Sequence, residues 1–202
     1  MREASNPLSV HEAIKLRCAV RSFHPDAVSE AAVRSLLAAA VRAPTAMHRE
    51  PWAFVIVQDR VRLRRLSDRV KARWEETPPH AERHVLAVVP EAGGFLEALS
   101  RPDFNVFYDA GTLILICARP LSQFVTADCW LAAENLMLAA CGLGLGTCMV
   151  GSAIEALNIP DVKSELAIPT DVMVIAPIIV GVPSGLAAPT SRSPPEILTW
   201  VH

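Results

Sequence analysis

The chain has 202 residues, of which 51% are hydrophobic, 20% charged and 5% aromatic, with 19 Lys and Arg against 21 Asp and Glu. This balance argues against a nucleic-acid-binding protein, which normally carries a basic excess, and the hydrophobic content argues against a disordered chain. The length suits a single domain, spanning residues 1–202, with a substantial core.

Cysteine usage and the absence of a long apolar run predict a cytoplasmic protein. The five cysteines are odd in number and none has C-x-x-C spacing, so we expect free thiols and neither a disulfide framework nor a metal site: Cys18, Cys117, Cys129, Cys141 and Cys148. The N-terminus is charged where a signal peptide needs an apolar core. The longest uncharged, largely apolar stretch, Leu136–Gly151, is shorter than a spanning helix.

The first third of the chain predicts two helices and a strand. Ser9 and Glu12 have capping-box spacing, which predicts a helix over residues 10–17. A second helix is indicated by one apolar face, and Pro44 ends it: Val33, Leu36, Leu37, Ala40 and Val41. Residues 53–57 (AFVIV) predict a buried strand.

Residues 60–76 predict a charged helix with an apolar line at Leu66, Val70 and Trp74. Its basic residues form the only candidate nucleic-acid stripe: Arg60, Arg62, Arg64, Arg65, Arg69, Lys71 and Arg73. Acidic residues interrupt the stripe and no aromatic platform accompanies it, which favours a solvated helix face over an interaction protein. Residues 77–104 permit either short helices or an edge strand.

The second half predicts a buried strand over 112–118, a long apolar helix over 126–141, a strand over 147–150 and a strand over 171–182. Ser152 and Glu155 repeat the capping-box spacing before a short helix, and a Pro-rich tail follows the last strand. Helices separated by single buried strands indicate an α+β or α/β domain.

The glycine cluster Gly142, Gly144, Gly146 does not match a dinucleotide-binding fingerprint. The third glycine is missing, and the cluster follows a helix and precedes a strand. It is typical of a helix C-terminus with glycine in the left-handed conformation.

Two further features suggest binding. Three arginines would bind a phosphate if the fold brought them together: Arg17, Arg21 and Arg192. The loop 43–52 lies between a helix and a strand and is rich in hydrogen-bond donors, where binding residues often concentrate. A plain connector is its alternative interpretation.

Five segments of the chain, in the same order as in the family, resemble the FMN-dependent nitroreductases. The chain has the length of the family's short members. Residues 17–23 (RCAVRSF) resemble the family's opening Arg-x-Ser-x-Arg/Lys…Phe pattern, and residues 43–54 (APTAMHREPWAF) resemble Ala-Pro-Ser-x-x-Asn-x-Gln-Pro-Trp-x-Phe. Asp109-Ala110 precedes a strand that fits the family's central strand, and residues 133–147 fit its core helix and following turn.

The resemblance implies an α+β fold: a sheet core flanked by helices, in a homodimer with FMN at the interface. It implies an oxidoreductase that passes a hydride from NAD(P)H through the flavin to a nitro, quinone or related small-molecule electrophile, in a ping-pong cycle. No protein side chain is then needed as a catalytic group, since the flavin carries the chemistry. Neither nucleic acid nor a membrane is expected as a partner.

The resemblance also implies the residues that bind the cofactor. Arg17 and Arg192 would hold the phosphate, Cys18 and Ala19 would line the site by backbone, and Arg21 would lie at the pyrimidine edge. The partner subunit would supply Pro44, Thr45, Ala46 and His48. The stretch Met149, Val150, Gly151 and Ser152 would pass close to the ring, with Asn105 also reaching it.

Three residues depart from the family pattern. Ala19 replaces a Ser or Thr, His48 an Asn, and Glu50 a Gln. Unless His48 or an arginine neutralises it, a carboxylate at Glu50 would make the flavin harder to reduce and anionic substrates less favoured. These departures leave open a second reading, a non-catalytic flavin-binding dimer with a decayed active site.

Overall fold

The computed structural model describes residues 8–76, 94, 97–185 and 190–201. Its centre is a four-stranded antiparallel sheet in the order β1-β2-β4-β3. The strands are Trp52–Val57 (β1), Thr112–Ala118 (β2), Gly146–Met149 (β3) and Met173–Gly181 (β4). An antiparallel sheet with packed helices confirms the α+β expectation.

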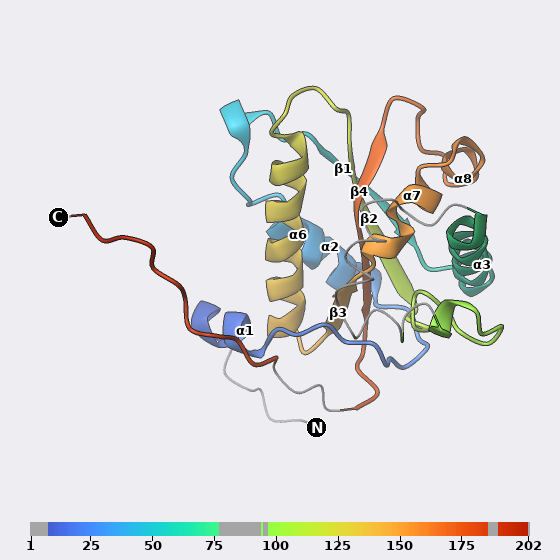
Figure 1. The fold of residues 1–202 in the computed structure, drawn as a ribbon, viewed down its shortest axis with the longest axis horizontal. Coiled ribbons are helices and arrows are strands. Elements are labelled where there is room, and N and C mark those ends of the chain that lie inside the picture. Colours follow the sequence, from blue (N-terminus) through green and yellow to red (C-terminus); the bar gives the residue numbers. More distant parts are fainter. Residues whose placement is uncertain (1–7, 77–93, 95–96, 186–189, 202) are drawn as a thin grey trace.

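Helices cover both faces of this sheet (Figure 1). On one face, α2 (Glu30–Ala40) and α6 (Val125–Gly142) pack on the buried side chains of Ile114 and Ile178. On the other face lie α3 (Arg60–Glu76), α7 (Ile154–Leu157) and α8 (Pro160–Glu165), in the cluster that contains Leu113 and Ile179. Both faces of the central strands are therefore buried, as continuous apolar runs require.

The outer strand β1 is less buried than the other three strands of the sheet. Every residue of β2 is buried, as predicted. The strand predicted over residues 53–57 is confirmed as β1, but only its Val57 is fully buried and Ile56 is 37% exposed, so the predicted burial is wrong. β1 has a single neighbour in the sheet, which leaves one edge and part of one face uncovered.

Local sequence signals place most helix ends correctly. The Ser9–Glu12 capping box is present and starts α1 (Val10–Leu16). The second helix begins earlier than its apolar face, because Ser29 caps it, and it ends before Val41, which is 39% exposed.

The expected capping box at Ser152 and Glu155 is wrong. A 3-10 turn, η2 (Gly151–Ala153), occupies this position, and α7 follows it with Ala153 as an N-cap that makes no side-chain hydrogen bond. Helix α8 was not expected from the sequence, although Pro160 stands in its first turn, where proline is favoured.

The end of α6 is a Schellman motif. The N–H of Leu145 donates to the carbonyl of Ala140 at 2.9 Å, and the N–H of Gly144 donates to Cys141 at 3.0 Å. Gly144 has a φ of +71°, the left-handed conformation that glycine adopts without steric cost. The interpretation of the glycine cluster as a helix terminus is confirmed.

The basic stripe of α3 is largely ion-paired. Arg65 and Arg69 contact Glu165 at 3.2 and 3.4 Å, and Lys71 contacts Asp68 at 3.4 Å. These pairs favour a helix face whose charges are balanced within the chain. The alternatives for residues 77–104 fall mostly on positions outside the described residues.

Within the described part of the chain, no helix combines the length and apolar character needed to cross a bilayer.

Candidate functional site

The site is built where the segment after α1 runs along the free edge of β3. The N–H of Val20 donates to the carbonyl of Thr147 at 2.9 Å, and Ala19 forms a parallel bridge with the same residue. A Cβ added at Gly146 would lie 2.8 Å from Val20, so the absence of a side chain there permits the close approach. This pairing fixes Arg17 and Arg21 on either side of one β-bridge.

Arg17 lies in a cavity of about 380 Å³ between α1, α6 and β3. Its guanidinium Nε lies 3.6 Å from a carboxylate oxygen of Glu134 on α6, and the Arg17 side chain is only 22% exposed. Cys18 and Cys141 line the same cavity, and Gly146 and Thr147 form its β3 wall.

Arg21 lies in a second cavity, of about 580 Å³. All four residues of the stretch predicted to pass close to the ring line it together with Arg21: Met149, Val150, Gly151 and Ser152. Two contacts fix this stretch, since the Val150 N–H donates to the Pro177 carbonyl and the Trp74 indole N–H donates to the Ser152 carbonyl at 2.8 Å. The structure thus brings Arg21 and residues 149–152 together.

An aromatic pair forms another wall of this second cavity. Phe104 and Tyr108 meet edge to face, with ring centroids 5.6 Å apart. Burial raises the pKa of the Tyr108 hydroxyl, while the charge of Arg21 and a hydrogen bond from it act in the opposite direction. The positive charge of Arg21 therefore acts on the phenol as well as in the cavity.

Cys148 links the two cavities, because it follows Thr147 of the first and lines the second. Burial raises the pKa of its thiol, and the positive charges of Arg21 and Arg17 both oppose that shift. Both guanidiniums are therefore within electrostatic reach of one buried sulfur. The two cavities adjoin along β3, with one cation in each. The sequence predicts a strand over residues 147–150 but does not mark Thr147 or Cys148 as site residues, because no local signal shows that the segment with Arg17 and Arg21 pairs with this strand.

The loop Pro44–His48 lies elsewhere. Its 3-10 turn, η1 (Ala46–His48), is joined to the first turn of α6, where Asp128 Oδ1 accepts a hydrogen bond from the Ala46 N–H at 3.2 Å. The cavity around Arg17 is instead lined by Met137 and Cys141, near the other end of that helix. At 1.5 Å per residue, nine to thirteen residues separate these contacts by about 13 to 20 Å (Figure 1).

This loop has an unusual backbone. Met47, His48 and Glu50 all have positive φ, at 55°, 52° and 43°. For residues with a Cβ, such a conformation costs roughly 1 kcal/mol or more each, and it persists only where surrounding contacts impose it. Met47, His48 and Glu50 are all exposed.

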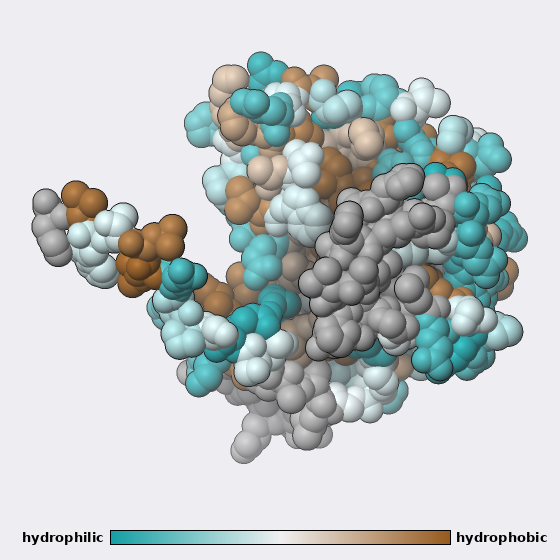
Figure 2. All heavy atoms as spheres, viewed as in Figure 1, coloured by the Kyte–Doolittle hydropathy of each residue, from teal (hydrophilic) through white to brown (hydrophobic). Residues whose placement is uncertain are grey.

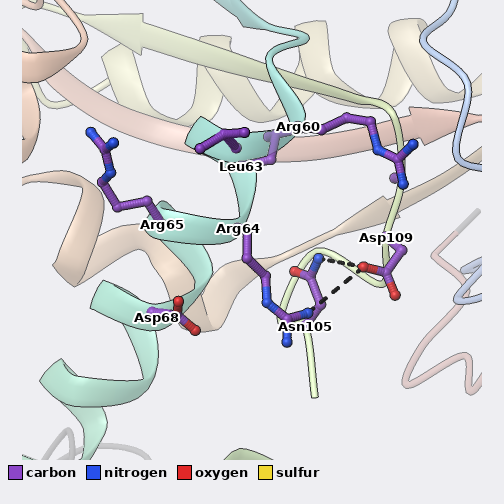
Figure 3. A pocket seen from close by; sticks show the side chains of 9 residues that line it. Arg60, Leu63, Arg64, Arg65, Asp68, Asn105 and Asp109 are labelled. Carbon is purple, nitrogen blue, oxygen red and sulfur yellow. Dashed lines mark hydrogen bonds and ion pairs between the residues drawn. The ribbon is translucent and has the colours of Figure 1, made fainter. Parts of the chain in front are cut away.

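Asn105 does not line the cavity around Arg21. Its side chain donates to Asp109 Oδ1 at 2.8 Å and accepts from the Phe107 N–H at 2.9 Å. It lines a third cavity against α3, where Arg64 also approaches Asp109, while Arg65 points away (Figure 3). The amide of Asn105 is thus used to shape the loop before β2.

Arg192 lies in the extended C-terminal segment. It is exposed, its guanidinium donates to the carbonyl of Ser191 at 3.3 Å, and it lines neither the Arg17 nor the Arg21 cavity. Within one copy of the described chain, the structure does not bring Arg192 to Arg17.

Comparisons with known proteins agree with this architecture. The model of the Nitroreductase family matches residues 14–182. A nitrobenzene nitroreductase of Ectopseudomonas oleovorans is 27% identical, with 96% of this chain and 97% of the relative covered. An Archaeoglobus fulgidus protein, named provisionally as an NADH dehydrogenase/NAD(P)H nitroreductase, is 27% identical over 84% of this chain and 83% of the relative.

Among solved structures, a nitroreductase with bound FMN from Bacteroides fragilis superposes with a TM-score of 0.80 at 25% identity, covering 96% of this chain and all of the other. The family model spans most of the chain, including the segment along β3 and the strands that form both cavities. The chain belongs to the nitroreductase family.

Proposed function

We propose that residues 1–202 form a single FMN-binding domain that works as a homodimeric oxidoreductase. It would take reducing equivalents from NAD(P)H and pass them in alternating, ping-pong steps to a nitro compound, quinone or related electrophile. The observation that carries the proposal is the pair of adjoining cavities along β3, each with one arginine.

The residues present fit an elongated mononucleotide with an anionic tail. Arg17 would bind the phosphate, since its pairing with Glu134 uses one of the five N–H donors of a guanidinium. Cys18 and Ala19 would line this half, and Arg192 would reach the phosphate only if the C-terminal segment rearranged or came from another copy.

Arg21 and residues 149–152 would hold the flavin ring. FMN, when bound, supplies the hydride chemistry. The fixed charge of Arg21 would stabilise negative charge that develops at the ring's pyrimidine edge, because a preoriented cation needs no reorganisation during reaction. Gly151 is exposed, and a Cβ there would meet no atom within 4 Å, so the backbone of this stretch is open to a planar ligand.

A second copy would complete the site. The loop Pro44–His48 is at the end of α6 remote from Arg17, so it would serve a partner's cavity rather than its own. The surface of one copy carries apolar side chains suited to such an interface: Val10 and Ile14 on α1, Trp130 and Leu131 on α6, and Ile197, Leu198 and Val201 in the tail. Figure 2 shows this tail projecting from the body with apolar residues on it.

The names of two relatives support NAD(P)H as the reducing substrate and a nitro compound as the substrate that is reduced. One is called a nitrobenzene nitroreductase and another carries NADH and NAD(P)H in its name. Arg21 and the aromatic pair Phe104–Tyr108 would face the reacting ligands from one side of the cavity.

Colour and bleaching test the proposal. We expect purified protein to be yellow with FMN, to bleach anaerobically on addition of NADPH or NADH, and to regain colour with nitroaromatics, quinones or enones. A yellow protein that neither nucleotide bleaches would support the non-catalytic binding dimer. A colourless protein that takes up no added FMN would contradict both.

A further inference from the structure

We infer that Asp128 is a positioning residue for the cofactor site of the partner subunit, through its hold on the loop Pro44–His48. The inference rests on the proposed FMN site and names a residue outside it. Asp128 was not singled out by the sequence, where it is one charged residue in a largely apolar helix.

The first observation is the burial of this carboxylate. Asp128 is 5% exposed, in the first turn of α6. Its Oδ1 accepts a hydrogen bond from the Ala46 N–H at 3.2 Å. A buried carboxylate is costly unless it is hydrogen-bonded, and the positive end of a helix dipole favours it at this position.

The second observation is how little else holds the loop. Its other hydrogen bonds are local, from His48 N–H to the Thr45 carbonyl and from Arg49 N–H to the Ala46 carbonyl. In the part of the chain that the structure describes, the bond to Asp128 is the one hydrogen bond that joins residues 44–48 to another element.

The third observation is the left-handed backbone at Met47 and His48, immediately after Ala46. A strained conformation persists only where the structure around it fixes both ends. The bond at Ala46 fixes one end, and β1 begins at Trp52 on the other side. Loss of the bond at Ala46 would let the loop relax away from the geometry in which it meets a cofactor.

Affinity for FMN tests the inference directly. We expect Asp128→Ala to weaken FMN binding by about tenfold or more, because a hydrogen bond to a charged acceptor is lost. Asp128→Asn keeps an acceptor oxygen and should weaken it less. Asp161→Asn, at a carboxylate whose side chain is 84% exposed on α8, is the matched control and should bind FMN like the parent. Equal affinities for the parent and both Asp128 variants would overturn the inference.

Mixed dimers test whether Asp128 acts across the interface. In a dimer of one Arg17→Ala chain and one Asp128→Ala chain, both defects fall in the same site, so the other site should bind FMN with parental affinity. When both substitutions are in one chain and the partner is unaltered, each site has one defect and neither should bind tightly. The reverse pattern, or identical binding by the two mixed dimers, would show that Asp128 acts within its own chain or only on folding.

Trypsin gives a readout that does not depend on FMN. Arg49 is exposed at the end of the loop, so Asp128→Ala should speed cleavage after Arg49 in flavin-free protein, with Asp161→Asn unchanged. If the parent protein binds no FMN while this acceleration is seen, the proposed function fails and the anchoring role of Asp128 stands. If cleavage is unchanged, the anchoring role is wrong whatever the protein binds.

Discussion

Arg17 and Arg21 illustrate how single residues gain a role from their surroundings. Four residues apart after a short helix, they resemble ordinary surface arginines. In the structure, Arg17 is mostly buried and pairs with Glu134, and the charge of Arg21 acts on the Tyr108 phenol. Both charges act on the thiol of Cys148. Because the two arginines are separated along one β-bridged segment, they suit a ligand that carries or develops negative charge at both ends.

The cysteines should differ sharply in reactivity, and FMN should change the pattern. Burial raises the pKa of Cys117 to about 12 and of Cys129 to about 11, so at pH 8 both remain protonated and unreactive. Burial also raises the pKa of Cys148. Burial raises the pKa of Cys141 as well, but Cys18 and Cys141 are half-buried whereas the other three thiols are buried, so a thiol reagent should label chiefly these two.

Because Cys18 and Cys141 line the Arg17 cavity, added FMN should slow their labelling. Mass spectrometry of the labelled native protein, with guanidinium-unfolded protein as the control in which all five react, provides the measurement. Labelling of these two thiols that is indifferent to FMN would place the phosphate elsewhere.

Among the residues that depart from the family pattern, Glu50 has the clearest electrostatic consequence. It is exposed, with a φ of 43°, and it follows the loop Pro44–His48 that we propose for the partner's site. Replacing it by Gln removes a negative charge from the neighbourhood of the ring, so Glu50→Gln should raise the midpoint potential of bound flavin. An interaction of about 1 kcal/mol corresponds to about 20 mV for two electrons. Spectroscopic redox titration measures it, and an unchanged or lower potential removes Glu50 from this account.

At the scale of elements, the decisive contact is between the segment 17–23 and β3. The sequence predicts α1 and β3 separately, from a capping box and a short apolar run, but their adjacency depends on residues more than a hundred positions apart. Gly146 permits it because Val20 occupies the space that a side chain would fill. A glycine required for close approach could not be distinguished, in sequence, from its neighbour Gly144, which serves a left-handed turn.

Substitution of Gly146 tests that contact. Gly146→Ala should lower the free energy of unfolding by about 1 to 3 kcal/mol through overpacking, and it should weaken FMN binding, because the arginine-bearing segment is pushed off β3. Urea denaturation and FMN titration provide the two measurements.

The matched control is Gly142→Ala at the last residue of α6, where an added Cβ meets nothing within 4 Å, so the free energy of unfolding should not fall and should rise by up to about 1 kcal/mol, because alanine favours a helix over glycine. If overpacking is the cause, Val20→Ala combined with Gly146→Ala should cost less than the two substitutions added together. Additive costs would mean that the two residues do not clash.

At the scale of the whole molecule, two groups of site residues lie toward opposite ends of α6. This helix has 18 residues and is about 27 Å long, so one copy of the chain does not bring the loop Pro44–His48 to its own cavities. In the homodimer that we propose, each copy would receive the loop that the other presents.

A charged substitution on the exposed face of α6 should dissociate the proposed dimer and, at the same time, release FMN. Leu131 is 46% exposed on α6, and Leu131→Asp would bury an unpaired charge at the proposed interface, weakening the dimer on the order of a hundredfold. Val61→Asp, at a 70% exposed valine on α3, is the control and should leave the dimer intact.

Light scattering reports the mass of each variant, and flavin fluorescence reports retention of FMN. A Leu131→Asp protein that is monomeric and still binds FMN tightly would contradict a site shared between copies.

Local signals in the sequence predict most of the elements, and also the family. Caps such as Ser9, the apolar face of α2, the continuous apolar run of β2 and the ordered motifs are local signals, and they predicted the strands, most helix boundaries and the family correctly. Tertiary structure alone decided which candidates meet. It joined Arg21 to residues 149–152, turned Asn105 toward Asp109, left Arg192 exposed and set Asp128 beneath the loop at Ala46. These outcomes depend on contacts between residues distant along the chain, which local periodicity and capping do not encode.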